Sequence, residues 1–152
     1  MAIVVGREGN ELLEFITGDE SELAGNPCCK PLTFCVVVAK HKGRYLLVYD
    51  KGRAEWEVPG GMIDKGESPR RCAERELLEE SNQTVPDLKF RGMMKFRLKP
   101  DGRIEYGMLY SGELLEFKDF QENDEIREIV LWDEKTDIGY INEVDIKLLD
   151  FY

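Results

Sequence analysis

Alternating apolar and polar positions predict short extended segments along most of the chain. The clearest pair is residues 33–40 and 44–50, in which β-branched and aromatic residues flank the turn HKGR. These segments are predicted to form a hairpin. Residues 88–100 and 103–115 are predicted to form a second, longer hairpin across the turn PDGR. Shorter strands are expected at residues 3–5, 11–17, 55–59 and 128–133.

One long helix is predicted between the two hairpins, over residues 69–81. Ser68 is a suitable N-cap, and Pro69 suits the first helical position because its missing N–H has no partner there. Asn82 tolerates the left-handed conformation that often ends a helix. The sequence therefore defines both ends of this helix.

The remaining segments complete a mixed architecture. A short C-terminal helix is expected within residues 144–152, whereas residues 18–27 are predicted to be a loop. Many strands around one dominant helix predict an α+β or mixed α/β fold with a mixed sheet. Because no repeat or long linker divides the chain, residues 1–152 are expected to form a single domain.

Composition limits the partners. Apolar residues make up 42% and charged residues 34% of the chain, which is typical of globular proteins. The N-terminus lacks the features of a signal peptide, and no apolar run approaches the roughly 20 residues that span a bilayer. A cytoplasmic protein without membrane contact is expected. The formal charge of −10 makes nucleic-acid binding unfavourable.

Cysteine and histidine content limits the chemistry. The four cysteines include no CxxC pair, and His41 is the only histidine, so neither a zinc site nor a Ser-His-Asp triad is expected. The cysteines are interpreted mainly as small buried apolar residues.

The acidic stretch ERELLEESN lies within the predicted helix. Helical spacing places Glu76, Glu79 and Glu80 on one face, beside an apolar stripe that includes Leu77, whereas Glu74 points away. Like charges at this spacing repel one another, and the helix dipole disfavours them near the C-terminus. The face is either a solvated surface or a cation site. Carboxylates alone suit hard ions such as Mg²⁺ or Mn²⁺.

The residues before this face favour the cation site. From residue 61 the chain has a glycine, five residues, a glutamate, seven residues, the triplet REL, one residue and the pair EE. This closely resembles the Nudix hydrolase box, GX5EX7REUXEEXGU with U a bulky aliphatic residue. WEVPGG, just upstream, is similar to the lead-in common in that family. The fixed positions that match are Gly61, Glu67, Arg75, Glu76, Glu79 and Glu80.

Two positions depart from the box. Asn82 replaces its glycine and Gln83 replaces its aliphatic residue. Asn82 can still end the helix, whereas Gln83 puts a polar group where the family buries an apolar one, which leaves its effect on local packing open. Neither position supplies a metal ligand in the family.

The resemblance implies an α/β/α sandwich around a mixed sheet and a bound Mg²⁺, with Mn²⁺ as the alternative. By position in the box, Glu76 and Glu80 are the leading ligands and Glu79 the third. A backbone carbonyl at Gly60 or Gly61 is a further candidate. Glu67 is expected to bind the metal through water or to orient the helix.

The same resemblance implies catalytic roles. Arg75 is expected to position a glutamate rather than to touch phosphate. The general base is either Glu79 or Glu80 within the box, or a glutamate outside it, for which Glu122 and Glu125 in QENDEI are the candidates. The alternative interpretation of QENDEI is an ordinary acidic loop.

The implied reaction is hydrolysis of a nucleoside diphosphate linked to a further group. The predicted activity is MutT-like: a nucleoside triphosphate, including oxidised forms such as 8-oxo-dGTP, gives the monophosphate and pyrophosphate. Alternative substrates are ADP-ribose, a dinucleotide polyphosphate or an RNA 5′ end. A catalytically silent nucleotide sensor, or a fold with adventitious cation binding, are the other hypotheses. Candidate base-stacking aromatics are Phe34, Tyr45, Phe96, Tyr106 and Trp132, and Arg53 is a candidate phosphate contact.

Overall fold

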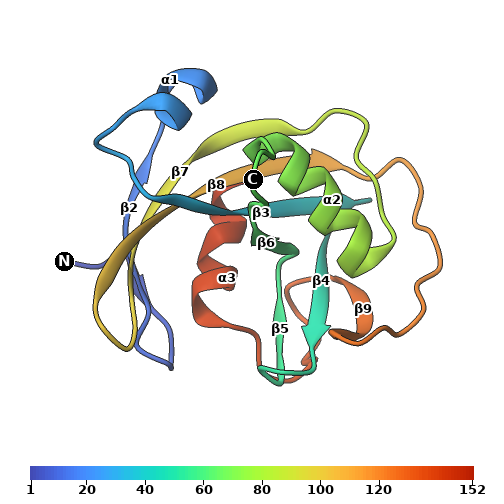
Figure 1. The fold of residues 1–152 in the computed structure, drawn as a ribbon. Coiled ribbons are helices and arrows are strands. Elements are labelled where there is room, and N and C mark those ends of the chain that lie inside the picture. The colour runs from blue at the N-terminus through green and yellow to red at the C-terminus, as the bar shows by residue number, and fades with distance from the viewer.

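A computed structural model describes all residues, 1–152, as one mixed sheet with helices on both faces (Figure 1). The strands are β1 (Val4–Val5), β2 (Glu11–Ile16), β3 (Leu32–His41), β4 (Arg44–Asp50), β5 (Glu55–Glu57), β6 (Gly60–Met62), β7 (Lys89–Leu98), β8 (Arg103–Glu113) and β9 (Ile126–Trp132). The helices are α1 (Glu20–Gly25), α2 (Pro69–Ser81) and α3 (Glu143–Leu148), followed by a 3₁₀ turn (Leu149–Phe151).

The sheet has the order β1-β2-β7-β8-β3-β4-β5, with β6 paired to β3 and β9 paired to β4. Strands β3 and β8 run parallel and all other named pairs are antiparallel. The prediction of an α+β fold with a mixed sheet is therefore confirmed. Both predicted hairpins form, but the ladder between β3 and β4 has only two residue pairs, because β4 pairs with β9 and β5 over the rest of its length.

The core is divided by the sheet into two clusters. Val37 and Met108 belong to the cluster under α2, whereas their neighbours Val38 and Leu109 belong to the cluster under α3. Successive residues of a strand point to opposite faces, so a strand that is apolar at consecutive positions has both faces covered. The layers are thus helix, sheet and helix, as the family resemblance implied.

One segment contradicts the sequence expectation. Residues 18–27 were predicted to be a loop, but they contain α1. The Asp19 side chain caps this helix by accepting a hydrogen bond from the Glu22 backbone N–H at 3.0 Å. Glu20 then receives hydrogen bonds from Arg70 on α2 and from the Tyr110 hydroxyl on β8, at 2.7 and 2.8 Å. A helix of six residues shows too little periodicity for the apolar pattern to reveal it.

Strand β6 was also not predicted. Glycine has a low strand propensity, but the Gly60–Met62 segment pairs with β3 at Val36, Cys35 and Phe34. A Cβ on Gly60 would lie 2.4 Å from the Cys35 carbonyl oxygen, so only glycine allows the two backbones to lie this close. In addition, no helix is long and apolar enough to cross a membrane.

Candidate active site

Helix α2 carries the box and has the predicted bounds. The Ser68 hydroxyl accepts a hydrogen bond from the Arg71 N–H at 3.2 Å, and Pro69 occupies the first turn. At the other end Asn82 adopts φ 60° and ψ 23°, and its N–H bonds to the Leu78 carbonyl. The asparagine thus ends the helix in the left-handed conformation that glycine adopts in the family pattern.

Gln83, the second departure from the box, is fully buried and yet hydrogen-bonded. Its Nε2 donates to the Ser81 and Lys118 carbonyls at 3.0 and 2.7 Å, and its Oε1 accepts from the Lys118 N–H at 2.9 Å. The sequence left the effect of Gln83 on local packing open, and the structure shows that this buried amide has hydrogen-bond partners and so carries no unpaired penalty. The residue instead joins α2 to the β8–β9 loop.

Arg75 lies at the centre of the box carboxylates. Its Nε donates to Glu67 at 2.8 Å, and its Nη1 donates to Glu76 and Glu79 at 2.9 and 3.1 Å. Its Nη2 donates to the Met62 carbonyl at 3.0 Å. These hydrogen bonds from Arg75, together with the Asp64 N–H, lower the pKa of Glu67 to about 2. The guanidinium therefore holds the loop and α2 together and fixes three carboxylates that would otherwise repel one another.

Glu76 and Glu80 face the glycines of β6. Glu80 is 6% exposed, and its Oε1 accepts a hydrogen bond from the Gly60 N–H at 2.9 Å. A Cβ on Gly61 would lie 2.4 Å from the carboxyl carbon of Glu76. Glycine at position 61 therefore lets the carboxylate approach the backbone directly. Glu74, in contrast, is exposed, as the helical spacing predicted.

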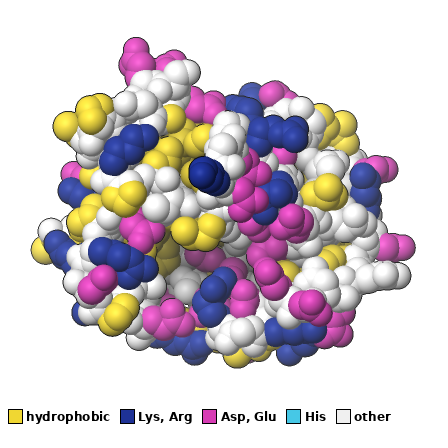
Figure 2. Space-filling view, viewed as in Figure 1, with side chains coloured by type: hydrophobic (Ala, Val, Ile, Leu, Met, Phe, Trp, Pro, Cys, Tyr) yellow, Lys and Arg dark blue, Asp and Glu magenta, His cyan; other side chains and the backbone are white.

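Of these two carboxylates, Glu76 is paired with Arg75, whereas Glu80 has no cationic partner. Burial, together with the charges of Glu76, Glu57 and Glu125, raises the pKa of Glu80 to about 8. Burial also raises the pKa of Glu76, helped by Glu79 and Glu125. Figure 2 shows acidic side chains gathered beside a hollow near the middle of this face. Ionised carboxylates that lie close together and buried repel one another, and a bound cation offsets this repulsion.

The donor set fits a hard divalent cation, because the groups near β6 are carboxylates and backbone carbonyls. However, no three acidic, histidine or cysteine side chains are arranged closely enough to form a complete metal cluster by themselves. Arg75 already binds Glu67, Glu76 and Glu79. Glu80, whose only hydrogen-bond partner is a backbone N–H, is the box carboxylate most available to a cation.

The structure distinguishes the two glutamates outside the box. Glu122 forms an ion pair with Lys51 at 2.6 Å. Glu125 instead contributes to the raised pKa values of both Glu76 and Glu80, so its carboxylate lies within their electrostatic range. Glu122 is thus held by a cation, whereas Glu125 forms no ion pair.

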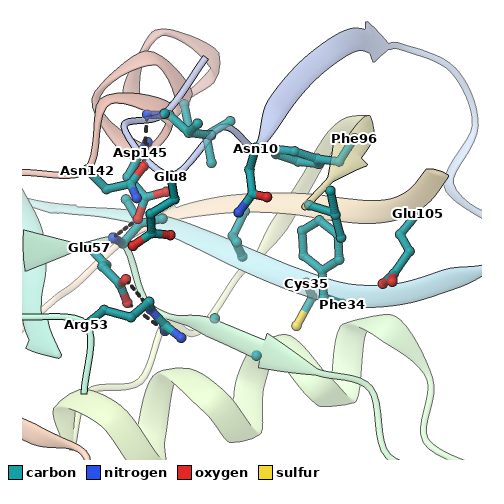
Figure 3. Close-up of a pocket in the computed structure, with 18 of the residues that line it drawn as sticks. Glu8, Asn10, Phe34, Cys35, Arg53, Glu57, Phe96, Glu105, Asn142 and Asp145 are labelled. Carbon is teal, nitrogen blue, oxygen red and sulfur yellow. Dashed lines mark hydrogen bonds and ion pairs between the residues drawn. The ribbon is translucent and has the colours of Figure 1, made fainter. Parts of the chain in front are cut away.

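A cavity of about 430 Å³ adjoins the box at Gly60, Gly61 and Met62 (Figure 3). Phe34 and Phe96 line it and make an edge-to-face contact, with ring centroids 5.5 Å apart. The other three candidate aromatic residues do not line it: Tyr45, Tyr106 and Trp132. A cavity of this size is within the range of small-molecule sites.

Charged residues form another wall of the cavity, and two of them, Glu57 and Asp145, were missed by the sequence interpretation (Figure 3). Arg53 donates two hydrogen bonds to the Glu57 carboxylate, at 2.6 and 2.9 Å, and a further hydrogen bond to Asp50. Burial raises the pKa of Glu57 to about 8 and that of Asp145 to about 8. Arg53 thus lines the cavity but is already paired. The motif WEVPGG contained Glu57, yet nothing in the sequence separated it from an ordinary strand residue.

The cysteines lie mostly where they were expected. All four are free; Cys29, Cys35 and Cys72 are buried, whereas Cys28 is exposed. The sulfur atoms of Cys35 and Cys72 lie 2.7 Å apart beneath β6, in the core between β3 and α2.

Comparison with known proteins agrees with this geometry. Residues 30–150 match the NUDIX domain, which is most of the chain. The protein therefore belongs to the NUDIX domain family.

Among curated relatives, a putative 8-oxo-dGTP diphosphatase of Bacillus subtilis is 44% identical over 81 residues, which cover 53% of this chain and 54% of that protein. The chain spans about half of the length of such relatives, between 44% and 60% for the first three. The names of these relatives agree with the prediction of a hydrolase.

Solved structures show the same fold. The Bacillus subtilis pyrophosphohydrolase BsRppH superimposes with a TM-score of 0.70 at 21% identity, covering 91% of this chain and 81% of that one. The NUDIX domain of Shewanella oneidensis NrtR, complexed with ADP ribose, gives a TM-score of 0.65 at 16% identity, covering 88% and 96%. At these identities the likeness supports the fold rather than a substrate.

Proposed function

We propose that this protein is a Mg²⁺-dependent pyrophosphohydrolase that cleaves a nucleoside triphosphate, including oxidised forms such as 8-oxo-dGTP, to the monophosphate and pyrophosphate. The observation that carries the proposal is the position of the box carboxylates. Glu80 and Glu76 lie against Gly60 and Gly61, which line the cavity, so a nucleoside in the cavity would bring its phosphates to these two carboxylates.

The proposed metal-binding groups are the carboxylates and carbonyl of the box: Gly61, Glu67, Glu76, Glu79 and Glu80. A bound divalent ion would neutralise phosphate charge and make a water molecule more acidic. Glu80 is the leading ligand because it is buried and lacks a cationic partner. Glu67 is engaged by Arg75, so it would bind the ion through a water molecule rather than directly.

The proposed catalytic group consists of Arg75, Glu79, Glu80 and Glu125. Arg75 holds Glu76 and Glu79 in fixed orientations. Glu125 approaches the same carboxylates from the β8–β9 loop, and its exposed side chain is free to accept a proton from an attacking water. Glu125 is therefore preferred to Glu122, which is paired with Lys51.

The relatives support the oxidised-nucleotide substrate, since one is named as a putative 8-oxo-dGTP diphosphatase. ADP-ribose is the second candidate, because the NrtR domain of similar fold was solved with that ligand. An RNA 5′ end is less favourable, because the net charge of −10 repels a polyanion.

The deciding experiment is a hydrolysis assay with Mg²⁺, in which the nucleotide products and pyrophosphate are separated and quantified, on dGTP, 8-oxo-dGTP, ADP-ribose, a dinucleotide polyphosphate and a 5′-triphosphorylated RNA. Wild type is expected to hydrolyse the triphosphates best, and Glu80→Gln is expected to lower kcat about a thousandfold. Glu74→Gln is the matched control, since Glu74 is exposed on the same helix.

The outcomes separate the hypotheses. Turnover of 8-oxo-dGTP that depends on Glu80 supports the proposal, whereas preference for ADP-ribose replaces the substrate. Binding of a nucleotide without turnover would indicate a sensor. Neither binding nor turnover for any substrate would leave only adventitious cation binding.

A further inference from the structure

The β8–β9 loop runs along the last turns of α2. Lys118 exchanges backbone hydrogen bonds with the Gln83 side chain, and the next residue, Asp119, accepts from Asn82 Nδ2 at 2.8 Å. Further along the loop, Asn123 Nδ2 donates to the Glu79 carbonyl at 3.2 Å. Later residues of the loop therefore contact earlier residues of α2, so that the loop and the helix run in opposite directions.

Asn123 makes the last of these contacts and also forms the turn that leads into β9. Its Oδ1 accepts hydrogen bonds from the N–H groups of Glu125 and Ile126 at 2.9 and 2.8 Å. Its own N–H bonds to the Ile126 carbonyl at 3.0 Å, which closes the turn at the start of β9. Lys51 holds the outside of the turn, because its Nζ bonds the Asn123 carbonyl at 2.7 Å. One side chain thus ties the backbone of Glu125 to the backbone of the box helix.

Glu125 follows directly on this path. The contact two residues earlier joins Asn123 to the backbone of Glu79, next to Glu80, so the turn that carries Glu125 lies beside the last turns of α2. The backbone of Glu125 is held from the other side as well, since its carbonyl accepts from the Lys51 N–H at 2.8 Å. The Glu125 carboxylate is exposed and makes neither a hydrogen bond nor an ion pair within the chain.

We propose that Asn123 is a positioning residue for the reaction: it fixes Glu125 against the box helix, so that the carboxylate from outside the box meets the carboxylates within it. This inference rests on the proposed function and goes beyond it, because Asn123 itself touches neither substrate nor metal. A carboxylate on an exposed loop samples many positions, and reactions lose rate steeply when a group moves by about 1 Å.

The test compares kcat and KM for Asn123→Ala, Asn123→Asp, Glu125→Gln and the double variant Asn123→Ala/Glu125→Gln, with hydrogen exchange at the Glu125 and Ile126 amides. Asn123→Ala is expected to lower kcat at least tenfold with KM within twofold, and to speed exchange at both amides. Asn123→Asp keeps the acceptor for both amides but loses the donor to Glu79, so it should restore amide protection and give an intermediate kcat.

The double variant decides whether Asn123 acts through Glu125. We expect it to be no slower than Glu125→Gln alone. An extra loss in the double variant, equal rates for the Asp and Ala variants, or a Glu125→Gln variant as fast as wild type would each overturn the proposal. If Asn123→Ala does not fold, Asn123→Asp and the double-variant comparison made with Asn123→Ser decide the same question.

Asp133→Ala is the matched control. Asp133 caps a similar turn, accepting from the Lys135 and Thr136 amides at 2.9 and 2.7 Å, but beyond the far end of β9. The Asp133→Ala variant should show faster hydrogen exchange at these amides and an unchanged kcat. If wild type hydrolyses no nucleotide, the proposed function fails, whereas unchanged exchange in Asn123→Ala would contradict the positioning inference by itself.

Discussion

Every carboxylate of the box comes from residues 67–80, whereas the cavity beside it is lined by residues from Gly6 to Leu148. The box is positioned by one helix, one loop and Arg75, which are neighbours in the sequence. The cavity wall combines the β1–β2 loop, β3, β5, β7, β8 and α3. The difference indicates that the candidate metal-binding residues are neighbours in the sequence, whereas the cavity wall is assembled by tertiary structure.

The largest predicted effect is on the local side of this comparison. Gly61→Ala would place a Cβ 2.4 Å from the Glu76 carboxyl carbon, so the carboxylate must move. We expect kcat to fall about a hundredfold, because moving a reacting group by about 1 Å from its position can lower the rate by this factor. Steady-state kinetics would measure it. Gly25→Ala, where an added Cβ meets nothing within 4 Å, should be neutral, and a neutral Gly61→Ala would contradict the assigned site.

The next effect is on the cavity side. Phe34→Ala removes one of the two aromatic rings that line the cavity and should raise KM about tenfold while kcat changes little. Comparing KM for a purine and a pyrimidine triphosphate would separate the loss of base stacking from a general loss of substrate affinity. If kcat falls instead and KM stays constant, the cavity does not hold the nucleoside. Circular dichroism before each assay would identify variants that do not fold.

The pH dependence of stability tests the charge imbalance of the box. The folded-state pKa of Glu80 is about 8, above its ordinary value of 4.5, so its stabilising contribution is full below about pH 4.5 and is lost as pH rises to 8. Asp145 acts in the same direction, with a pKa raised to about 8. Glu67, with a pKa lowered to about 2, is charged across this window and adds no slope.

Thermal unfolding in the presence of a chelator should therefore show a lower Tm at about pH 8.5 than at about pH 6. Added Mg²⁺ should raise Tm more at the higher pH, because the ion binds the ionised carboxylates. Glu80→Gln should weaken both trends and Glu74→Gln should leave them intact. A Tm that rises from pH 6 to 8.5 without metal would argue against a buried, uncompensated Glu80.

The smallest effect on activity is expected at Gln83, where box and tertiary structure meet. Gln83→Leu restores the aliphatic residue of the family pattern but leaves the Lys118 N–H and carbonyl without partners. We expect a loss of about 1–3 kcal/mol in the free energy of unfolding, measured by urea denaturation, and little change in kcat. Gln121→Leu, at an exposed glutamine of the same loop, should cost under about 0.5 kcal/mol.

Parts of the fold were predictable because their signals are local. Ser68, Pro69 and Asn82 defined α2 to the residue, and alternating apolar positions located both hairpins. Helix α1 and strand β6 were missed for the opposite reason. Glu20 is held by Arg70 and Tyr110, and Gly60 is held by β3, so both elements depend on partners far away in the chain.

The candidate site divides in the same way. Spacing along one helix placed Glu76, Glu79 and Glu80 together and turned Glu74 to solvent. Spacing had no means of choosing between Glu122 and Glu125, because the ion pair to Lys51 and the turn around Asn123 both depend on β4 lying beside β9. It also had no means of finding Asp145, whose partner in the cavity wall is the Val58 N–H.

By itself, the sequence determined the family, the course of α2 and the identity of the acidic cluster, since helical periodicity and capping act over fewer than ten residues. Only the tertiary structure decided which carboxylates stay unbalanced, which outside glutamate approaches them and what shape the cavity takes. Burial and long-range pairing govern these properties, because the free energy of a charge depends on everything that surrounds it in the folded chain.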